Sequence, residues 1–264
     1  MIRPGLLALV LLITACGQEE TAAPPQGAGL PKSEVVSGTA FLTPATRAEQ
    51  EDEMLNPGYL WVDEGEALFE NDSGVKAACS SCHGTGGSSL KGAAARYPAM
   101  DETSGELVNL EGRINLCRTI HQDAAPLAYE SEALLSLTAY VANLSHGEPL
   151  AVSLNEQTRP YYKAGRDYFY TRRGQLNLSC HQCHDLNWGN QLRGDTISQG
   201  HGNGFPAYRL EWQTLGSLHR RLRDCEAGIR AEPRDYGSRE YLALELYLAI
   251  RAKGLEIETP AIRR

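Results

Sequence analysis

Two short segments of the chain carry residues that can attach and ligate a metal-containing cofactor. CSSCH occupies residues 79–83 and CHQCH occupies residues 180–184, and both have the pattern C-x-x-C-H. At the start of a helix, cysteines at i and i+3 lie on one side and can form thioethers with the two vinyl groups of a haem, and the histidine at i+4 faces the iron from that side. The pattern therefore predicts two covalently bound haem c groups. The thioether residues are Cys79, Cys82, Cys180 and Cys183, and the proximal iron ligands are His83 and His184.

Two other kinds of site use the same cysteine spacing. A thioredoxin-like dithiol and half of a zinc site both contain C-x-x-C. Neither requires a histidine directly after the second cysteine, which both copies have here. Two intact copies with this histidine, in a chain that begins with an export signal, favour haem.

The N-terminus has the features of a bacterial export signal. A basic start with Arg3 precedes the apolar run LLALVLLITA, which is too short for a bilayer span of about 20 residues. The residues ITAC, ending at Cys16, match a lipobox, in which the cysteine is lipidated and becomes the mature N-terminus. The other interpretation is ordinary cleavage near Ala15, which would leave a soluble protein. We expect a periplasmic protein and favour a lipid anchor at Cys16 and hence a membrane attachment.

Composition divides the chain and limits its partners. Residues 1–16 form the predicted leader, residues 17–50 are rich in Ala, Pro, Gly and Gln and are predicted to be a flexible tether, and two domains are expected over residues 51–152 and 153–264. The formal net charge of −8 argues against nucleic acid as a partner. Fifteen of the twenty arginines lie beyond residue 150, so a site for a small anion in the second half is compatible with the sequence.

The second half repeats the pattern of the first. Corresponding residues are separated by 100 to 108 positions, and each half ends in a helix-like stretch, EALLSLTAYVANL or REYLALELYLAIR. The corresponding residues outside the two motifs are Gly65 and Gly165, Phe69 and Phe169, Cys117 and Cys225, and Tyr140 and Tyr247.

Each repeat resembles the cytochrome c fold, in which a Gly-x-x-x-aromatic helix crosses an aromatic-bearing last helix. Gly65 and Gly165 would allow the two backbones to approach closely at that crossing. We therefore predict an all-α protein of two tandem cytochrome c-like domains with extensive loops. Gly147, Pro149 and Pro160 place the boundary between them near residues 148–160.

Methionine, the usual sixth iron ligand of electron-carrying c cytochromes, is nearly absent. No methionine follows Cys180. The remaining candidates are Met100, Cys117, His121 and His146 in the first half and His201, His219 and Cys225 in the second.

Only the cysteines among these candidates occupy matching positions in the two repeats. We therefore predict His83/Cys117 ligation of the first iron and His184/Cys225 ligation of the second. The alternative is a disulfide between Cys117 and Cys225, which an oxidising compartment would permit. A thiolate ligand stabilises ferric iron and lowers its reduction potential, so such a pair favours sulfur chemistry over general electron carriage.

Two C-x-x-C-H motifs, two lone downstream cysteines and the segment HRRLRDCEAGIRAEP resemble the SoxA family, over most of the chain from about residue 51 onward. The resemblance implies the dihaem subunit of a SoxAX cytochrome, an L-cysteine S-thiosulfotransferase that oxidatively joins thiosulfate to a cysteine of the carrier SoxYZ and passes the electrons to the monohaem subunit SoxX. It also implies that Cys225 is both the axial ligand and the active-site sulfur, and that Arg221 binds the substrate. The first haem would then have a structural or electronic role.

Two other functions remain open from the sequence. A thiosulfate dehydrogenase would form tetrathionate from thiosulfate alone, so product analysis without SoxYZ separates it from the SoxA function. A non-enzymatic dihaem electron carrier would be redox-active without yielding any sulfur product.

Overall fold

Helices and a few short strands make up the protein, which is known from a computed structural model that describes residues 30–264. The predicted leader, Cys16 and the first part of the predicted tether lie outside the described residues. In the first half the elements are, with η denoting a 3-10 helix, η1 (Lys32–Glu34), η2 (Gly38–Phe41), α1 (Pro44–Glu51), α2 (Tyr59–Glu70), α3 (Ser80–His83), η3 (Thr85–Leu90), η4 (Ala94–Arg96), β1 (Ala99–Met100), β2 (Leu107–Val108), α4 (Leu110–His121) and α5 (Glu132–Asn143).

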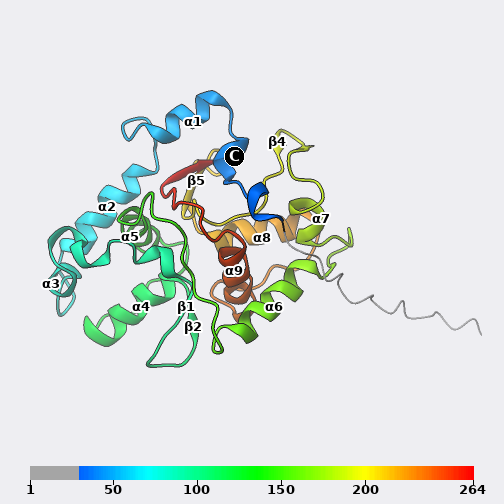
Figure 1. The fold of residues 1–264 in the computed structure, drawn as a ribbon. Helices are drawn as coiled ribbons and strands as arrows, with labels where there is room; N and C mark the ends of the chain where they lie inside the picture. The colour runs from blue at the N-terminus through cyan, green and yellow to red at the C-terminus, as the bar shows by residue number, and fades with distance from the viewer. Residues whose placement is uncertain (1–29) are drawn as a thin grey trace, which may run out of the picture.

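The second half has a similar order of helices. Its elements are α6 (Arg159–Tyr170), α7 (Cys180–His184), β3 (Gln191–Leu192), β4 (Asp195–Thr196), β5 (Ala207–Arg209), β6 (Thr214–Gly216), α8 (Leu218–Gly228), α9 (Arg239–Arg251) and β7 (Ala261–Arg263). Figure 1 shows α2, α4 and α5 grouped on one side of the molecule and α6, α8 and α9 on the other. The helical, tandem cytochrome c-like fold is confirmed.

Short strands are the main addition to the predicted all-α fold. β1 pairs with β2 and β3 pairs with β4, each antiparallel. The third sheet has the order β6-β5-β7, in which β5 is antiparallel to β6 and parallel to β7. This sheet brings residues near the C-terminus next to a segment that precedes α8.

Matching helices begin with matching side-chain caps. The Asn109 side chain accepts a hydrogen bond from the backbone of Gly112 at the start of α4. At the start of α8, the Ser217 side chain accepts one from the backbone of Arg220. Ser131 and Ser238 cap α5 and α9 in the same way. Such caps satisfy backbone donors that the first helical turn leaves free, and they fix where each helix starts.

The predicted helix crossing is present in the first half. A Cβ atom added to Gly65 of α2 would lie 2.1 Å from the carbonyl oxygen of Ser136 in α5, so only glycine fits there. The rings of Phe69 and Tyr140 pack beside the crossing with their centroids 5.2 Å apart.

The second half repeats this crossing between α6 and α9. A Cβ atom at Gly165 would lie 1.9 Å from the carbonyl oxygen of Ala243, and the rings of Phe169 and Tyr247 are again 5.2 Å apart. The internal duplication inferred from the sequence therefore extends to the packing of the paired helices.

The prediction of a tether up to residue 50 is wrong for residues 30–50. This segment contains η1, η2 and most of α1, and it is fixed to the second half. The backbone of Val36 donates to Gln199 at 2.9 Å, and the Thr39 hydroxyl donates to Glu258 at 2.8 Å. These contacts are polar and span more than 160 residues, so composition gave no sign of them.

Polar residues from both halves form a buried cluster between the domains. His219 of α8 is 1% exposed, and its Nε2 lies 3.0 Å from an oxygen of Glu245 in α9. Asn109 donates to the same carboxylate at 3.2 Å, and the ring of Tyr129 stacks on the imidazole with 5.8 Å between centroids. Buried Glu111 of α4 is close enough that the Glu245 carboxylate affects its pKa. The two halves are therefore joined by interacting ionisable groups.

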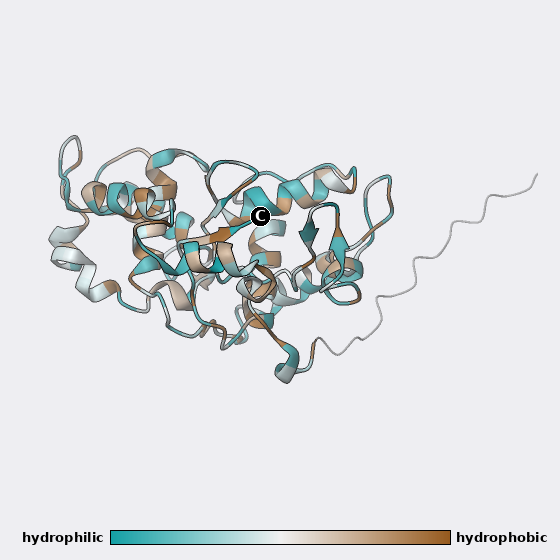
Figure 2. Ribbon diagram, turned by 90° about the horizontal axis from the view of Figure 1, so that it is seen from above, coloured by the Kyte–Doolittle hydropathy of each residue, from teal (hydrophilic) through white to brown (hydrophobic). Residues whose placement is uncertain are grey.

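The domain boundary predicted at residues 152 and 153 falls in the extended connection between α5 and α6. This connection pairs with the segment after α9, since the backbone of Leu150 donates to Leu255 at 2.9 Å. In Figure 2, apolar residues are dispersed along the ribbon and alternate with polar ones. Among residues 30–264, no helix combines the length and apolar character needed to cross a bilayer.

Candidate haem and substrate sites

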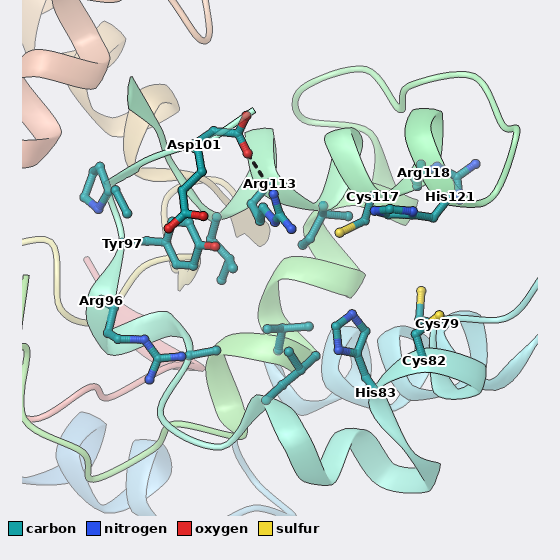
Figure 3. Close-up of a pocket in the computed structure, with 18 of the residues that line it drawn as sticks. Cys79, Cys82, His83, Arg96, Tyr97, Asp101, Arg113, Cys117, Arg118 and His121 are labelled. Atoms are coloured by element: carbon teal, nitrogen blue, oxygen red, sulfur yellow. Dashed lines mark hydrogen bonds and ion pairs between the residues drawn. The ribbon is translucent and has the colours of Figure 1, made fainter. Parts of the chain in front are cut away.

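The first C-x-x-C-H motif opens onto a cavity of about 590 Å³. Cys79 precedes α3, and Cys82 and His83 lie within it. Figure 3 shows the His83 imidazole and the Cys117 thiol entering this cavity from opposite sides, with Cys79 and Cys82 beside the imidazole. Residues 79–83 and α4 therefore place two thioether cysteines and two potential axial ligands around one space.

The side chains of this first site have distinct surroundings. The Nδ1 atom of His83 lies 3.3 Å from the Ser89 hydroxyl, which leaves Nε2 for a metal. Burial raises the pKa of the Cys117 thiol, and the Arg113 guanidinium beside it opposes this effect. Binding to a ferric iron would supply the positive charge that a thiolate needs here.

The rest of the cavity wall fits a porphyrin. Apolar residues line its interior, among them Phe69, Leu90, Leu137 and Val141. Arg96, Tyr97 and Arg113 also line it and could pair with the two carboxylates of a haem. Sequence reasoning missed these three residues, because none belongs to a motif.

Of the other predicted ligand candidates in the first half, Met100 and His121 also line the cavity. His146 does not, and its Nδ1 lies 3.1 Å from the carbonyl oxygen of Thr259. The first site thus retains three candidates for the sixth ligand, of which Figure 3 shows Cys117 opposite His83.

The second motif forms α7, which begins with a capping box. The backbone N–H of Ser179 donates to the Gln182 side chain at 2.9 Å, and this contact fixes the turn that carries Cys180 and Cys183. At the end of α7, Nδ1 of His184 donates to the carbonyl oxygen of Ser198 at 2.7 Å. This hydrogen bond fixes the ring orientation and leaves Nε2 free as a metal ligand.

Cys225 lies on α8 and faces this motif. Burial raises the pKa of its thiol. The charge of Arg221, a hydrogen bond with His184 and the charges of His184 and Arg209 together outweigh burial and lower the pKa to about 7. Burial is the main reason that the pKa values of Cys180 and Cys183 are raised. The charge of Cys225 raises both values further. The structure therefore brings the predicted cysteines and His184 together with Arg221.

The alternative of a disulfide between Cys117 and Cys225 is wrong for the described structure. All six described cysteines are free thiols. Cys117 lies close enough to Cys82 for their charges to interact, whereas Cys225 interacts in this way with Cys180 and Cys183. Each lone cysteine lies beside the motif of its own repeat.

Two histidines proposed as alternative ligands in the second half have other contacts. His201 is buried, its Nε2 lies 3.1 Å from the Gln199 side chain, and burial lowers its pKa to about 3. His219 accepts a hydrogen bond from the backbone of Gly237 at 3.1 Å and belongs to the cluster between the domains.

Three residues around the second site carry no sequence signal. Ser198 and Gly200 contact the His184 ring from a loop, and a Cβ atom at Gly200 would lie 2.9 Å from the ring. Arg209 lies on β5, which forms a short antiparallel pair with β6 just before α8. A helical or motif spacing cannot reveal residues that reach a site in this way.

Comparisons with known proteins define the class of this chain. Residues 64–150 match the SoxA/TsdA cytochrome c domain. The protein is therefore a c-type cytochrome, a class that carries covalently bound haem c.

Relatives that match most of the chain define the family. The chain is 37% identical over 245 residues to the L-cysteine S-thiosulfotransferase subunit SoxA of Pseudaminobacter salicylatoxidans, covering 92% of this chain and 85% of the relative. It is 37% identical to the SoxA subunit of Rhodovulum sulfidophilum, and this match covers 87% of this chain and 80% of the relative. The crystal structure of SoxXA from P. pantotrophus superposes with a TM-score of 0.83 at 34% identity and covers 87% of both chains. The chain belongs to the SoxA family.

Proposed function

We propose that this protein catalyses the oxidative conjugation of thiosulfate to a cysteine of a carrier protein, as an L-cysteine S-thiosulfotransferase of the SoxAX type. The observation that carries the proposal is the Cys225 thiol, held among cations beside His184 and the second C-x-x-C-H motif. The names of the relatives and the fold they share with this chain support it. Two haem c groups are proposed, because both repeats have the same arrangement of cysteines and histidine.

The reaction joins two sulfur atoms and releases two electrons. The carrier thiolate and the outer sulfur of thiosulfate form an S–S bond, R–S⁻ + S–SO₃²⁻ → R–S–S–SO₃⁻ + 2 e⁻, and no proton or leaving group is lost from this form of the reactants. A haem held by Cys180, Cys183 and His184 would supply one-electron redox chemistry at this site. SoxX is the proposed partner subunit that would receive the electrons, and the solved relative supports it because that structure is of a SoxXA complex.

The residues of this chain bind and orient the reactants. Arg221 lies one helical turn before Cys225, so its guanidinium can be next to the thiol. No carboxylate among residues 30–264 forms an ion pair with Arg221. A planar guanidinium suits the sulfonate oxygens of thiosulfate, so Arg221 is the proposed substrate-binding residue and Cys225 the proposed catalytic sulfur.

Replacing the lone cysteine of each repeat tests this assignment. Cys225→Met should retain both haems and the fold but lose conjugation, because the sulfur of a thioether is not a thiolate. Cys117→Met, at the matching position of the first repeat, is the control and should retain conjugation. The assay contains the complex with SoxX, the carrier SoxYZ, thiosulfate and ferricyanide, with the carrier adduct measured by mass spectrometry. Full activity of Cys225→Met would refute the assignment.

The same assay without carrier separates the alternative functions. Tetrathionate formed from thiosulfate alone would identify a thiosulfate dehydrogenase. Reduction and reoxidation with no sulfur product under any condition would identify an electron carrier. The proposed function predicts an adduct on the carrier and no tetrathionate in its absence.

The proposed location is the periplasm, with attachment to a membrane through a lipid on Cys16. The lipobox-like residues before Cys16 support this location. Mass spectrometry of the mature N-terminus tests it, since a diacylglyceryl-modified Cys16 is expected. An unmodified N-terminus after cleavage near Ala15 would show a soluble periplasmic form instead.

A further inference from the structure

A second arginine lies close to the proposed reaction site. Arg209, on the central strand of the β6-β5-β7 sheet, is only 2% exposed. Removing a charged side chain from water is unfavourable unless partners compensate it. The partners of Arg209 therefore indicate whether the protein itself compensates this charge.

The described partners compensate Arg209 only in part. One terminal nitrogen donates to Glu211 at 2.7 Å, but the Glu211 side chain is 55% exposed and remains largely in water. The Nε–H group is buried and has no hydrogen-bond acceptor among residues 30–264. Arg209 thus keeps one buried donor available for another acceptor.

The surroundings of Arg209 tie it to the helix that carries Cys225. Its Cζ lies 4.8 Å from the centroid of the Trp212 ring, and Cζ of Arg220 lies 4.2 Å from the same centroid. Trp212 also donates to Asp224, the residue before Cys225, at 2.8 Å. Strand β5 and helix α8 are therefore held together at this point.

The charges in this region favour an anion. Burial lowers the pKa of Arg209, and the positive charge of Arg221 lowers it further. Within residues 30–264, Arg209 has a donor without an acceptor and Arg221 has no ion pair, and these two guanidinium groups repel each other. An anion bound between two such groups would stabilise both.

We infer that Arg209 is a second substrate-binding residue, which donates its Nε–H to the anion that Arg221 holds at Cys225. This inference rests on the proposed function. Two guanidinium groups would favour a doubly charged anion such as thiosulfate over a singly charged one, so Arg209 contributes specificity as well as affinity.

Steady-state kinetics with Arg209→Met test the inference. The complex with SoxX is assayed with SoxYZ as carrier and thiosulfate as the varied substrate. The KM for thiosulfate should rise about tenfold or more, the loss expected for one charge-assisted hydrogen bond, while kcat changes less than about threefold. Arg209→Lys keeps the charge but cannot reproduce the Nε–H, so its KM should be intermediate.

Arg220→Met is the matched control, because Arg220 stacks on the same Trp212 ring but is not buried. Its KM should change less than about threefold. If Arg209→Met yields no folded holoprotein, the KM of Arg209→Lys decides, and a value equal to that of the wild type overturns the inference.

Two results would show that Arg209 has a different role. An unchanged KM in Arg209→Met overturns the inference directly. A shifted haem absorption spectrum or reduction potential with unchanged KM overturns it as well, and would assign Arg209 to stabilising the thiolate. Calorimetric titration of the same complex with sodium thiosulfate keeps the test independent of turnover. If the wild type binds thiosulfate and Arg209→Met binds it about tenfold more weakly but neither forms the adduct, the inference holds and the proposed function fails.

Discussion

At the level of single residues, the imidazole of His184 is held from two directions. Ser198 accepts its Nδ1–H, and the backbone of Gly200 packs against the ring face. Gly200 has a φ of +75°, so a side chain at this position would be strained and would also displace the ring. The orientation of the proposed iron ligand thus depends on two loop residues that do not touch the metal.

Gly200→Ala should disturb the second iron site without unfolding the protein. The added Cβ would meet ring atoms at 2.9 and 3.0 Å, so the imidazole must tilt. Of the two low-spin ferric signals expected in the electron paramagnetic resonance spectrum, one should shift and the other should remain. Gly74→Ala is the control, since Gly74 has a similar φ of +78° but no atom of the described residues lies within 4 Å of the added Cβ. Identical spectra for Gly200→Ala and the wild type would contradict the packing described.

Residue spacing was sufficient to find most of this site but not all of it. The C-x-x-C-H motifs and the matching cysteines predicted the groups that gather around each haem position, and their roles as ligands remain predictions. Arg209 could not be predicted, because a short antiparallel pair of strands, β5 and β6, positions it before α8. Polar residues on short strands have no periodicity that would distinguish them from a loop.

At the level of the elements, each half depends on one close helix crossing. Glycine at positions 65 and 165 lets the two backbones approach without an intervening side chain. The sequence predicted both crossings, because the glycine and the aromatic residue recur at the same spacing. The sequence did not predict that the segment before α1 has a defined structure. The contacts of this segment are hydrogen bonds between polar groups that are distant in sequence.

Gly165→Ala should destabilise the second half. Its Cβ would lie 1.9 Å from the carbonyl oxygen of Ala243, so α6 and α9 must separate. Overpacking of this kind costs about 3 kcal/mol or more, which should lower the Tm by about 6 °C or more. Circular dichroism of the holoprotein during heating measures the change.

Gly228→Ala is the control for this substitution. Gly228 ends α8, and an added Cβ would meet no atom within 4 Å in the part of the chain that the structure describes. The Tm should therefore stay the same or rise slightly. A Tm for Gly165→Ala within about 2 °C of the wild type would show that the helices can separate at little cost.

At the level of the whole molecule, the cluster between the domains makes stability depend on pH. Burial and the nearby Glu245 carboxylate raise the pKa of Glu111 from 4.5 to about 7. The folded protein therefore binds this proton more tightly than the unfolded chain. The stabilisation is fully present below about pH 4.5 and is lost as the pH rises through about 7.

Glu111→Gln should remove this dependence. At pH 8 the variant should be more stable than the wild type by about 3 kcal/mol, whereas near pH 5 the difference should be small. Differential scanning calorimetry at several pH values measures it. Glu66→Gln, which removes an exposed carboxylate from α2, controls for the change in net charge. Equal pH profiles for Glu111→Gln and the wild type would mean that Glu111 is ionised in the folded protein at pH 5.

The parallel pairing of β7 with β5 has a consequence for shortened forms of the protein. Residues 261–263 cover one edge of the strand that carries Arg209. A variant that ends at residue 260 would keep both C-x-x-C-H motifs and all of α8, but it would leave this edge of β5 without its partner strand. Trimming the C-terminal residues would therefore act on the strand next to the helix that carries Cys225.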